Sequence, residues 1–269
     1  MAGLSRSPYR GGWSMPPHLW YHRNQMRFLL LATDYDGTLA KDGHVEEQAI
    51  AALGRLRNSG RKLVLVTGRH LPDLTSIFSR FDLFDRVVLE NGGLLYRPVT
   101  REQKLLCDPP NARFLAALRE RQIPFVAGRT VVASWHPHED AVFSAIRALG
   151  LDLQITLNKD AVMVLPSGIN KATGLQAALD ELDISAHSVV AVGDAENDHP
   201  LLRMSECGVA VANALPALKE HADIVLDASH GDGVIKLVDG LIADDLAGFV
   251  STRGQKSVRD GSAVSLDLT

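Results

Sequence analysis

The sequence predicts an α/β fold, a doubly wound parallel sheet with a small α+β domain inserted between its two halves. Short apolar runs alternate with helical spacings in residues 26–93, and the same alternation resumes in residues 167–249. A different pattern, in which short strands cluster between two helices, separates them in residues 94–166. Strands that alternate with helices form parallel sheets with right-handed crossovers, so we expect the flanking segments to form one core domain.

The first half of the core holds three predicted strands, each a short apolar run that ends in a turn signal. Apolar residues at helical spacing predict a helix after the first strand, and a proline opens the next helix. In order, these elements are a strand from residue 27, a helix at 45–60, a strand at 62–66, a helix from residue 72 and a strand at 86–89.

The insertion and the second half of the core follow. In the insertion we predict helices around 111–119 and 139–149, and strands near 124–126, 130–134, 153–157 and 161–165. In the second half we predict helices at 170–182, after 194, at 216–221 and at 233–242, with strands at 188–192, 208–211 and 223–226. The second half therefore returns to the alternating pattern of a parallel sheet.

The composition argues against several classes of protein. The net charge of −4 gives no electrostatic basis for binding nucleic acid or an anionic membrane. The two cysteines, Cys107 and Cys207, are far apart in the sequence, which argues against a disulfide framework or a zinc site and favours the cytoplasm. No apolar run is long enough to span a bilayer. The sequence assigns no oligomeric state.

The two ends of the chain differ from the predicted core. Residues 1–25 lack periodicity and predict a disordered extension, and residues 250–269 predict a loose polar tail. Met26 stands directly before the first strand, so we hypothesise that translation begins there. The intact mass of the native protein tests this start site.

Two carboxylates follow the first strand. Asp34 and Asp36 are two residues apart, so alternation along an extended chain puts them on the same side, and Gly37 then allows a sharp turn. Like charges this close repel, and a hard divalent cation with oxygen ligands or a shared proton would relieve the repulsion. An ordinary polar turn at the end of a strand is the alternative interpretation.

Other strands of the predicted sheet also end in polar residues. Thr67 follows the second strand, and Asp194 and Asp198 follow the strand at 188–192. Ligands of open parallel sheets bind beyond the carboxyl ends of the strands, so we expect these acids to converge on a metal. Lys171 lies in the first turn of a predicted helix, where a cation is disfavoured unless an anion binds there. A solvated lysine is the alternative.

The order and spacing of four segments closely resemble the four motifs of haloacid dehalogenase-like (HAD) phosphatases. The segments are Asp34-Tyr35-Asp36-Gly37-Thr38, Thr67-Gly68-Arg69, Lys171, and Gly193-Asp194 through Asn197-Asp198. The resemblance covers roughly residues 27–242. There is room for a cap domain only between the second and third motifs. This position of the cap resembles the C2-capped branch of the superfamily, which is also called subfamily IIB or Cof-type. Glu90-Asn91-Gly92 and residues 167–171 also resemble that branch, whereas His199-Pro200 departs from its usual apolar pair.

The resemblance implies a mechanism and roles for individual residues. It implies that Asp34 is a nucleophile that forms an aspartyl-phosphate, and that Asp36 is the general acid and base. Mg²⁺ would be bound by Asp34, the backbone carbonyl of Asp36, Asp194 and Asp198. The phosphoryl group would be held by Thr67, the amide of Gly68, Lys171 and Asn197.

The resemblance also implies a small phosphate ester as substrate, such as a sugar phosphate or a phosphoglycolate-like compound. Candidates to contact the rest of the substrate are Arg69, Asn91, Gly92, Trp135, His136 and Asn158. A phosphomutase of the same superfamily is the nearest alternative. A phospho-aspartate receiver domain is a second alternative, but it would need no inserted domain. A binding protein without activity is disfavoured because no motif residue is missing.

Overall fold

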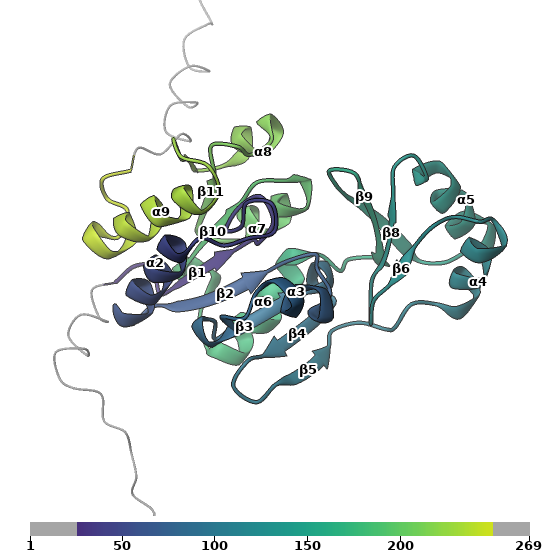
Figure 1. Cartoon of the computed structure of the whole chain (residues 1–269), viewed down its shortest axis with the longest axis horizontal. Helices are drawn as coiled ribbons and strands as arrows, with labels where there is room; N and C mark the ends of the chain where they lie inside the picture. The colour runs from purple at the N-terminus through teal and green to yellow at the C-terminus, as the bar shows by residue number, and fades with distance from the viewer. Residues whose placement is uncertain (1–25, 250–269) are drawn as a thin grey trace, which may run out of the picture.

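The computed structural model describes residues 26–249, which form a larger core and a smaller inserted unit at one end of it (Figure 1). We refer to the smaller unit as the cap. The predicted extension (residues 1–25) and the predicted tail (residues 250–269) lie outside this range. The start site predicted at Met26 depends on residues 1–25 and is therefore not tested by the structure. Within residues 26–249, no helix combines the length and the apolar character that a membrane crossing requires.

The core is organised around one sheet, with β1 near its centre. Leu30 of β1 pairs in parallel with Val189 on one side and with Lys62 on the other. Within the described residues the sheet has eight strands. Across the sheet, these are β12 (Ile224–Val225), β11 (Cys207–Ala210), β10 (Val189–Gly193), β1 (Leu30–Thr33), β2 (Lys62–Val66), β3 (Arg86–Leu89), β4 (Leu94–Arg97) and β5 (Glu102–Leu105).

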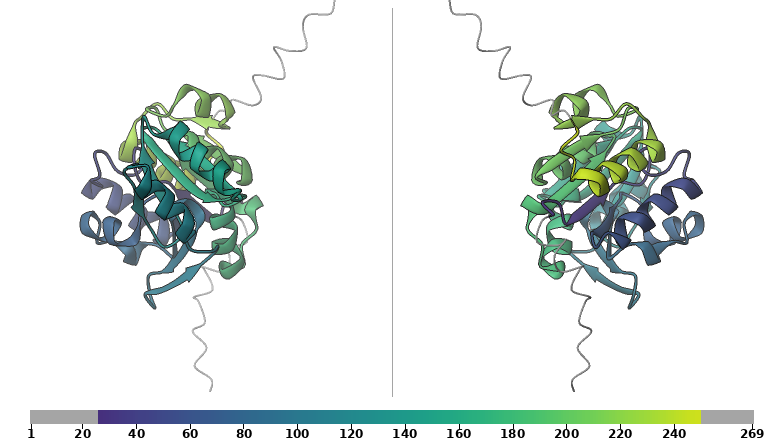
Figure 2. Two further views of the ribbon diagram at one scale, coloured as in Figure 1. Left: turned by 90° about the vertical axis from the view of Figure 1, so that its right-hand side faces the viewer. Right: turned by 90° about the vertical axis from the view of Figure 1, so that its left-hand side faces the viewer.

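Helices cover the core sheet (Figure 2). The core helices are α2 (Glu47–Asn58), α3 (Leu71–Ile77), α6 (Lys171–Leu182), α7 (His199–Met204), α8 (Pro216–His221) and α9 (His230–Asp244). Helix α2 packs against α9, and α6 packs against α7 and β3. Helix α2 buries Ala49, Leu53 and Leu56, residues that recur at helical spacing. The predicted doubly wound α/β fold is therefore confirmed.

The boundary predicted for the insertion at residue 94 is wrong. Strands β4 and β5 pair antiparallel with β3 and with each other, so they extend the core sheet and do not belong to the cap. Strand β5 is polar and lies at the edge of the sheet, where charged side chains discourage pairing with another chain. The inserted unit therefore starts after Leu105.

The cap is a four-stranded antiparallel sheet with two helices on its outer side (Figure 1). Its elements are α4 (Ala112–Glu120), β6 (Val126–Ala127), β7 (Val132–Trp135), α5 (Glu139–Leu149), β8 (Leu153–Asn158) and β9 (Ala161–Pro166). Phe114 and Ile146 of the helices form a separate small core with Val132, Val162 and Val164 of the sheet. Because side chains alternate along a strand, the intervening residues lie on the face toward the core domain.

Candidate active site

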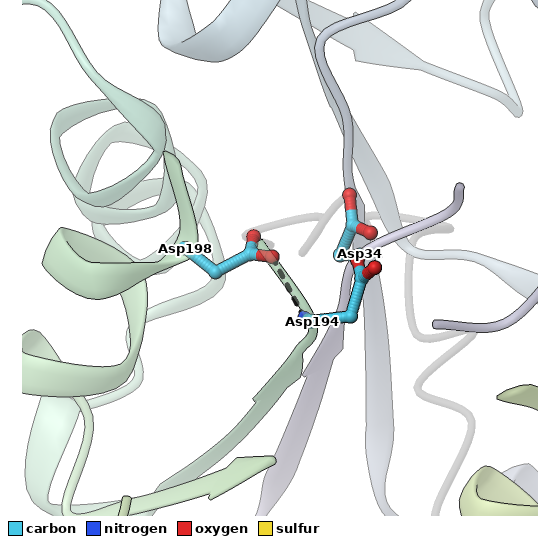
Figure 3. A group of neighbouring side chains, drawn as sticks. All are labelled: Asp34, Asp194 and Asp198. Atoms are coloured by element: carbon cyan, nitrogen blue, oxygen red, sulfur yellow. Dashed lines mark hydrogen bonds between the residues drawn. The ribbon is translucent and has the colours of Figure 1, made fainter. Parts of the chain in front are cut away.

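Three buried carboxylates meet at the carboxyl edge of the core sheet (Figure 3). Asp34 directly follows β1 and Asp194 directly follows β10, and these neighbouring parallel strands pair Thr33 with Val192. Asp198 comes from the short 3-10 turn after β10. Oxygen atoms of the three carboxylates lie within 4.8 Å of one another. The fold therefore brings together Asp34, Asp194 and Asp198, three of the four acids that we expected to converge.

Asp198 is fixed by the backbone that precedes it. Its Oδ2 accepts hydrogen bonds from the amides of Asp194 and Ala195, at 2.9 and 3.0 Å. The hydroxyl of Thr38 donates to Oδ1 of Asp194 at 3.2 Å. These bonds orient the carboxylates without neutralising them, so a cation is still needed to offset their mutual repulsion.

Lys171 supplies one such cation from the first turn of α6. Its side chain is 1% exposed, and its ammonium lies 2.6 Å from Oδ1 of Asp34 and 2.6 Å from Oδ1 of Asp198. Burial alone would lower the pKa of Lys171, but the two carboxylates more than offset this effect and raise it. The side chain of Asn170 caps the helix by accepting from the amides of Ala172 and Thr173, which fixes the position of Lys171.

The one buried ammonium, that of Lys171, does not balance three buried carboxylates, and the lysine that pairs with Asp194, Lys159, is half-exposed. Burial raises the pKa of the Asp34 carboxyl, Lys171 opposes this rise, and Asp198 and Asp194 add to it. A hard divalent cation prefers carboxylate oxygens and would stabilise the ionised form of all three acids. The set of donors at this buried site therefore fits such an ion.

Asp36, the fourth expected acid, is held apart from this triad. Its two oxygens accept from Nε and Nη2 of Arg69, at 2.6 and 2.8 Å. Arg69 also pairs with Asp73 and lies over the ring of Tyr35, 5.8 Å from its centroid. Thr67 accepts a hydrogen bond from the amide of Arg69 at 3.1 Å. Arg69 thus links the first and second motifs directly.

Two buried asparagines, Asn91 and Asn197, contact each other. Nδ2 of Asn197 donates to Oδ1 of Asn91 at 3.2 Å. Within residues 26–249, Nδ2 of Asn91 and Oδ1 of Asn197 are buried without a hydrogen-bond partner. Buried polar atoms normally have one, so this pair has capacity to bind a polar ligand. Asn197 also lies next to Gly68, with its Nδ2 4.0 Å from where a Cβ on Gly68 would be.

Gly92 lies where the backbone packs tightly against the start of α6. Its φ of +107° suits glycine, and a Cβ there would lie 2.0 Å from the carbonyl oxygen of Asn170. The backbone at Gly92 therefore packs closely against Asn170, the residue that caps α6. Of the predicted substrate contacts, neither Asn91 nor Gly92 lines the cavity between the core and the cap.

A cavity of about 500 Å³ lies between the core and the cap. The core lines it with Asp34, Asp36, Thr67, Gly68, Arg69, His70 and Asp73. The cap lines it with Val126, Ala133, Trp135, Asn158, Ala161 and Met163, which all lie on the sheet face opposite the cap helices. Of the predicted cap contacts, Trp135 and Asn158 reach this cavity. His136 instead pairs with Glu139 at 2.7 Å at the start of α5.

Two residues at the junction of core and cap carry contacts that sequence reasoning missed. Lys159, at the tip of the hairpin between β8 and β9, pairs with Oδ2 of Asp194 at 2.9 Å. Glu90, 1% exposed, accepts from the amides of Arg129, Thr130 and Val131 in the cap, at 2.7 to 3.1 Å. A lysine in a tight turn resembles any exposed turn residue, and Glu90 belongs to a motif that we interpreted only as a marker of the branch.

Comparisons with known proteins agree with this architecture. Residues 31–126 and 136–238 match the family described as haloacid dehalogenase-like hydrolase. The chain is 28% identical over 221 residues to phosphoglycolate phosphatase 2 of Saccharolobus solfataricus, with 80% of this chain and 93% of that protein covered. It is 31% identical over 224 residues to the phosphoglycolate phosphatase of Natronomonas pharaonis, with 78% and 96% covered.

Solved structures share the fold. A haloacid dehalogenase-like hydrolase from B. subtilis has a TM-score of 0.68 at 18% identity, covering 80% of this chain and 100% of its own. A sugar phosphatase of HAD subclass IIB has a TM-score of 0.65 at 20% identity, covering 79% and 98%. The chain therefore belongs to the haloacid dehalogenase-like hydrolase family and is a HAD-type phosphatase, and it shares its fold with a sugar phosphatase of HAD subclass IIB.

Proposed function

We propose that this phosphatase hydrolyses a small anionic phosphate monoester, with phosphoglycolate as the first candidate, through an aspartyl-phosphate on Asp34. The observation that carries the proposal is the buried triad of Asp34, Asp194 and Asp198, in which Lys171 pairs with Asp34 and Asp198 and Asp34 lines the cavity between core and cap. The relatives named as phosphoglycolate phosphatases, which align with about 80% of the chain, support this substrate class.

The first step transfers the phosphoryl group to the protein. An oxygen of Asp34 attacks phosphorus, the bond to the leaving oxygen breaks, and Asp36 donates a proton to that oxygen. In the structure both oxygens of Asp36 accept from Arg69, so substrate binding has to draw the guanidinium away from at least one of them. Arg69 lines the cavity and is a substrate contact in this proposal.

The second step releases phosphate. Asp36 accepts a proton from a water molecule, the water oxygen attacks phosphorus, and the bond between phosphorus and Asp34 breaks. Lys171, the hydroxyl of Thr67 and the amide of Gly68 hold the phosphoryl oxygens during both steps. In a loose transition state, such positioning and charge provide most of the rate enhancement.

The metal in this proposal is Mg²⁺. Asp34, Asp194 and Asp198, with the backbone carbonyl of Asp36, would hold it. When bound, it would offset the repulsion between an anionic nucleophile and an anionic phosphate. The buried oxygen donors and the raised pKa of Asp34 support this assignment.

A panel of phosphate esters tests the proposal. The purified protein is assayed with Mg²⁺ against phosphoglycolate, sugar phosphates and p-nitrophenyl phosphate, with released phosphate as the readout. We expect turnover of phosphoglycolate, and none by Asp34→Asn, which loses the nucleophile at the edge of the sheet and not in the apolar core. An isomerised sugar phosphate without free phosphate would indicate a mutase, and activity in a folded Asp34→Asn protein would contradict the proposed nucleophile.

A further inference from the structure

We infer that Lys159, at the tip of the cap, is a specificity residue that binds a second anionic group on the substrate. The substrate class is then a short phosphate ester whose leaving group carries a carboxylate. This inference rests on the proposed function, because it names the part of the substrate that the cap recognises.

The hairpin between β8 and β9 brings a cation from the cap to the catalytic edge of the core. Asn158 pairs with Ala161, so the turn consists of Lys159 and Asp160. The backbone amide of Lys159 donates to Glu196 at 3.3 Å, and its ammonium lies 2.9 Å from Oδ2 of Asp194. The tip of the cap therefore touches the loop that carries two acids of the triad.

The ammonium lies on the side of the acid–base residue. Nζ of Lys159 is 2.8 Å from where a Cβ on Gly37 would be, and Gly37 directly follows Asp36. Asp36 has to reach the leaving oxygen to protonate it, so atoms attached to that oxygen come close to the same turn. A leaving group only a few atoms long therefore brings its far end within reach of Lys159.

The exposure of Lys159 allows it to change partners. Its side chain is 51% exposed, whereas that of Asp194 is 2% exposed, so the carboxylate is fixed and the lysine is not. An ammonium on a flexible stem can move between two anions at little cost. Within the described part of the cap, Lys159 is the cation that the structure pairs with an acid of the triad.

The residues by which the cap lines the cavity, next to Lys159 in the chain and in the sheet, favour a compact anion over a sugar. Five of its six cavity residues, Val126, Ala133, Trp135, Ala161 and Met163, offer mainly apolar surface, and Asn158 is the polar exception. The hydroxyl groups of a sugar would lose their hydrogen bonds to water against such a surface. A carboxylate beside Lys159 would instead gain a charge-assisted hydrogen bond.

A pair of substrates matched in size isolates this charge. Phosphoglycolate ends in a carboxylate, and 2-hydroxyethyl phosphate has a hydroxymethyl group at the same place. We expect the wild type to prefer phosphoglycolate in kcat/KM. Lys159→Met should lower kcat/KM for phosphoglycolate by on the order of 10- to 100-fold, the contribution of a hydrogen bond to a charged group. For 2-hydroxyethyl phosphate, we expect a change of less than about 3-fold, within the range of a neutral contact.

Two further variants complete the experiment. Lys159→Arg should retain the preference because it keeps the cation. Lys236→Met is the matched control, since Lys236 is 52% exposed, pairs with Asp227 and lies on α9. If Lys159→Met lowers kcat/KM equally for both substrates, or for neither, the inference is overturned. Continued turnover of p-nitrophenyl phosphate would then leave the proposed function intact. A wild type that hydrolyses no ester would overturn both.

Discussion

The ammonium of Lys171 lies 2.6 Å from Oδ1 of Asp34 and joins it to Asp198, so one buried cation links the end of β1 to the turn after β10. The contact connects segments that are 137 and 27 residues from Lys171 in the chain. It also places a positive charge beside the proposed nucleophile, where the phosphoryl oxygens would bind.

Replacing this lysine should reduce stability as well as activity. In EDTA, Lys171→Met leaves two buried carboxylates without their partner, which should lower the free energy of unfolding by about 3–5 kcal/mol. Lys236→Met removes an exposed pair and should cost less than about 1 kcal/mol. Urea unfolding of both variants measures the difference, and equal midpoints would contradict a buried ion pair at Lys171.

Metal removal should abolish turnover reversibly. EDTA should eliminate phosphatase activity and Mg²⁺ should restore it, because three carboxylates and an anionic substrate repel one another without a cation. Ca²⁺ should restore much less, since it tolerates more ligands and looser geometry than Mg²⁺. The measurement is phosphate release after dialysis and addition of each ion. Full activity of metal-free protein would show that the triad is not a metal site.

Glu90 should hold the cap loop against the core. Its carboxylate accepts hydrogen bonds from the amides of Arg129, Thr130 and Val131. Glu90→Gln should therefore raise the rate of hydrogen exchange at these amides by about 10-fold or more. Because this loop leads into β7 and Trp135, kcat/KM should fall as well. Glu102→Gln, an exposed glutamate paired with Arg97, is the control. Unchanged exchange in Glu90→Gln would mean that the loop is held by other contacts.

Glu181 should make the core sensitive to acid. Hydrogen bonds from Arg97 and Arg86 lower the pKa of Glu181 to about 2. Burial acts in the opposite direction but is outweighed. A lowered folded-state pKa stabilises the fold above the ordinary carboxyl pKa of about 4.5, and this stability is lost as the pH falls toward about 2. Glu181→Gln should therefore destabilise the protein at about pH 7 and much less at about pH 3. Urea midpoints at both pH values test this, and a constant difference would contradict it.

The parallel core was predictable because its central strands are almost wholly buried and therefore form short, mainly apolar runs in the sequence. Strands β1, β2 and β10 have this character, and polar residues follow each of them. Strand β5 is different, because Glu102, Gln103 and Lys104 lie exposed at the sheet edge and give no apolar pattern. The missed edge hairpin explains why the predicted cap boundary fell too early.

The acids were predictable as a group because they follow neighbouring strands, but their individual partners were not. Nothing in the sequence indicates that Arg69 forms an ion pair with Asp36 or that Lys159 forms one with Asp194. Each contact depends on how loops from separate segments fold together. The same holds for His136, which lies beside Trp135 in the sequence but pairs away from the cavity. His136 follows the last residue of β7 and pairs with Glu139 of α5, so proximity in sequence does not predict a shared site.

The covalent intermediate on Asp34 is the central claim, and Asp36→Asn tests it most directly. The amide leaves the backbone carbonyl unchanged but cannot act as an acid or a base. A nitrophenolate leaves without a proton, so the first step should persist, whereas loss of the base should slow the second step by about 10²–10⁴-fold. Stopped-flow release of nitrophenol from excess p-nitrophenyl phosphate should then show a burst of about one equivalent, followed by slow turnover. Steady release without a burst, with equally small losses for alkyl and aryl phosphates, would contradict the account.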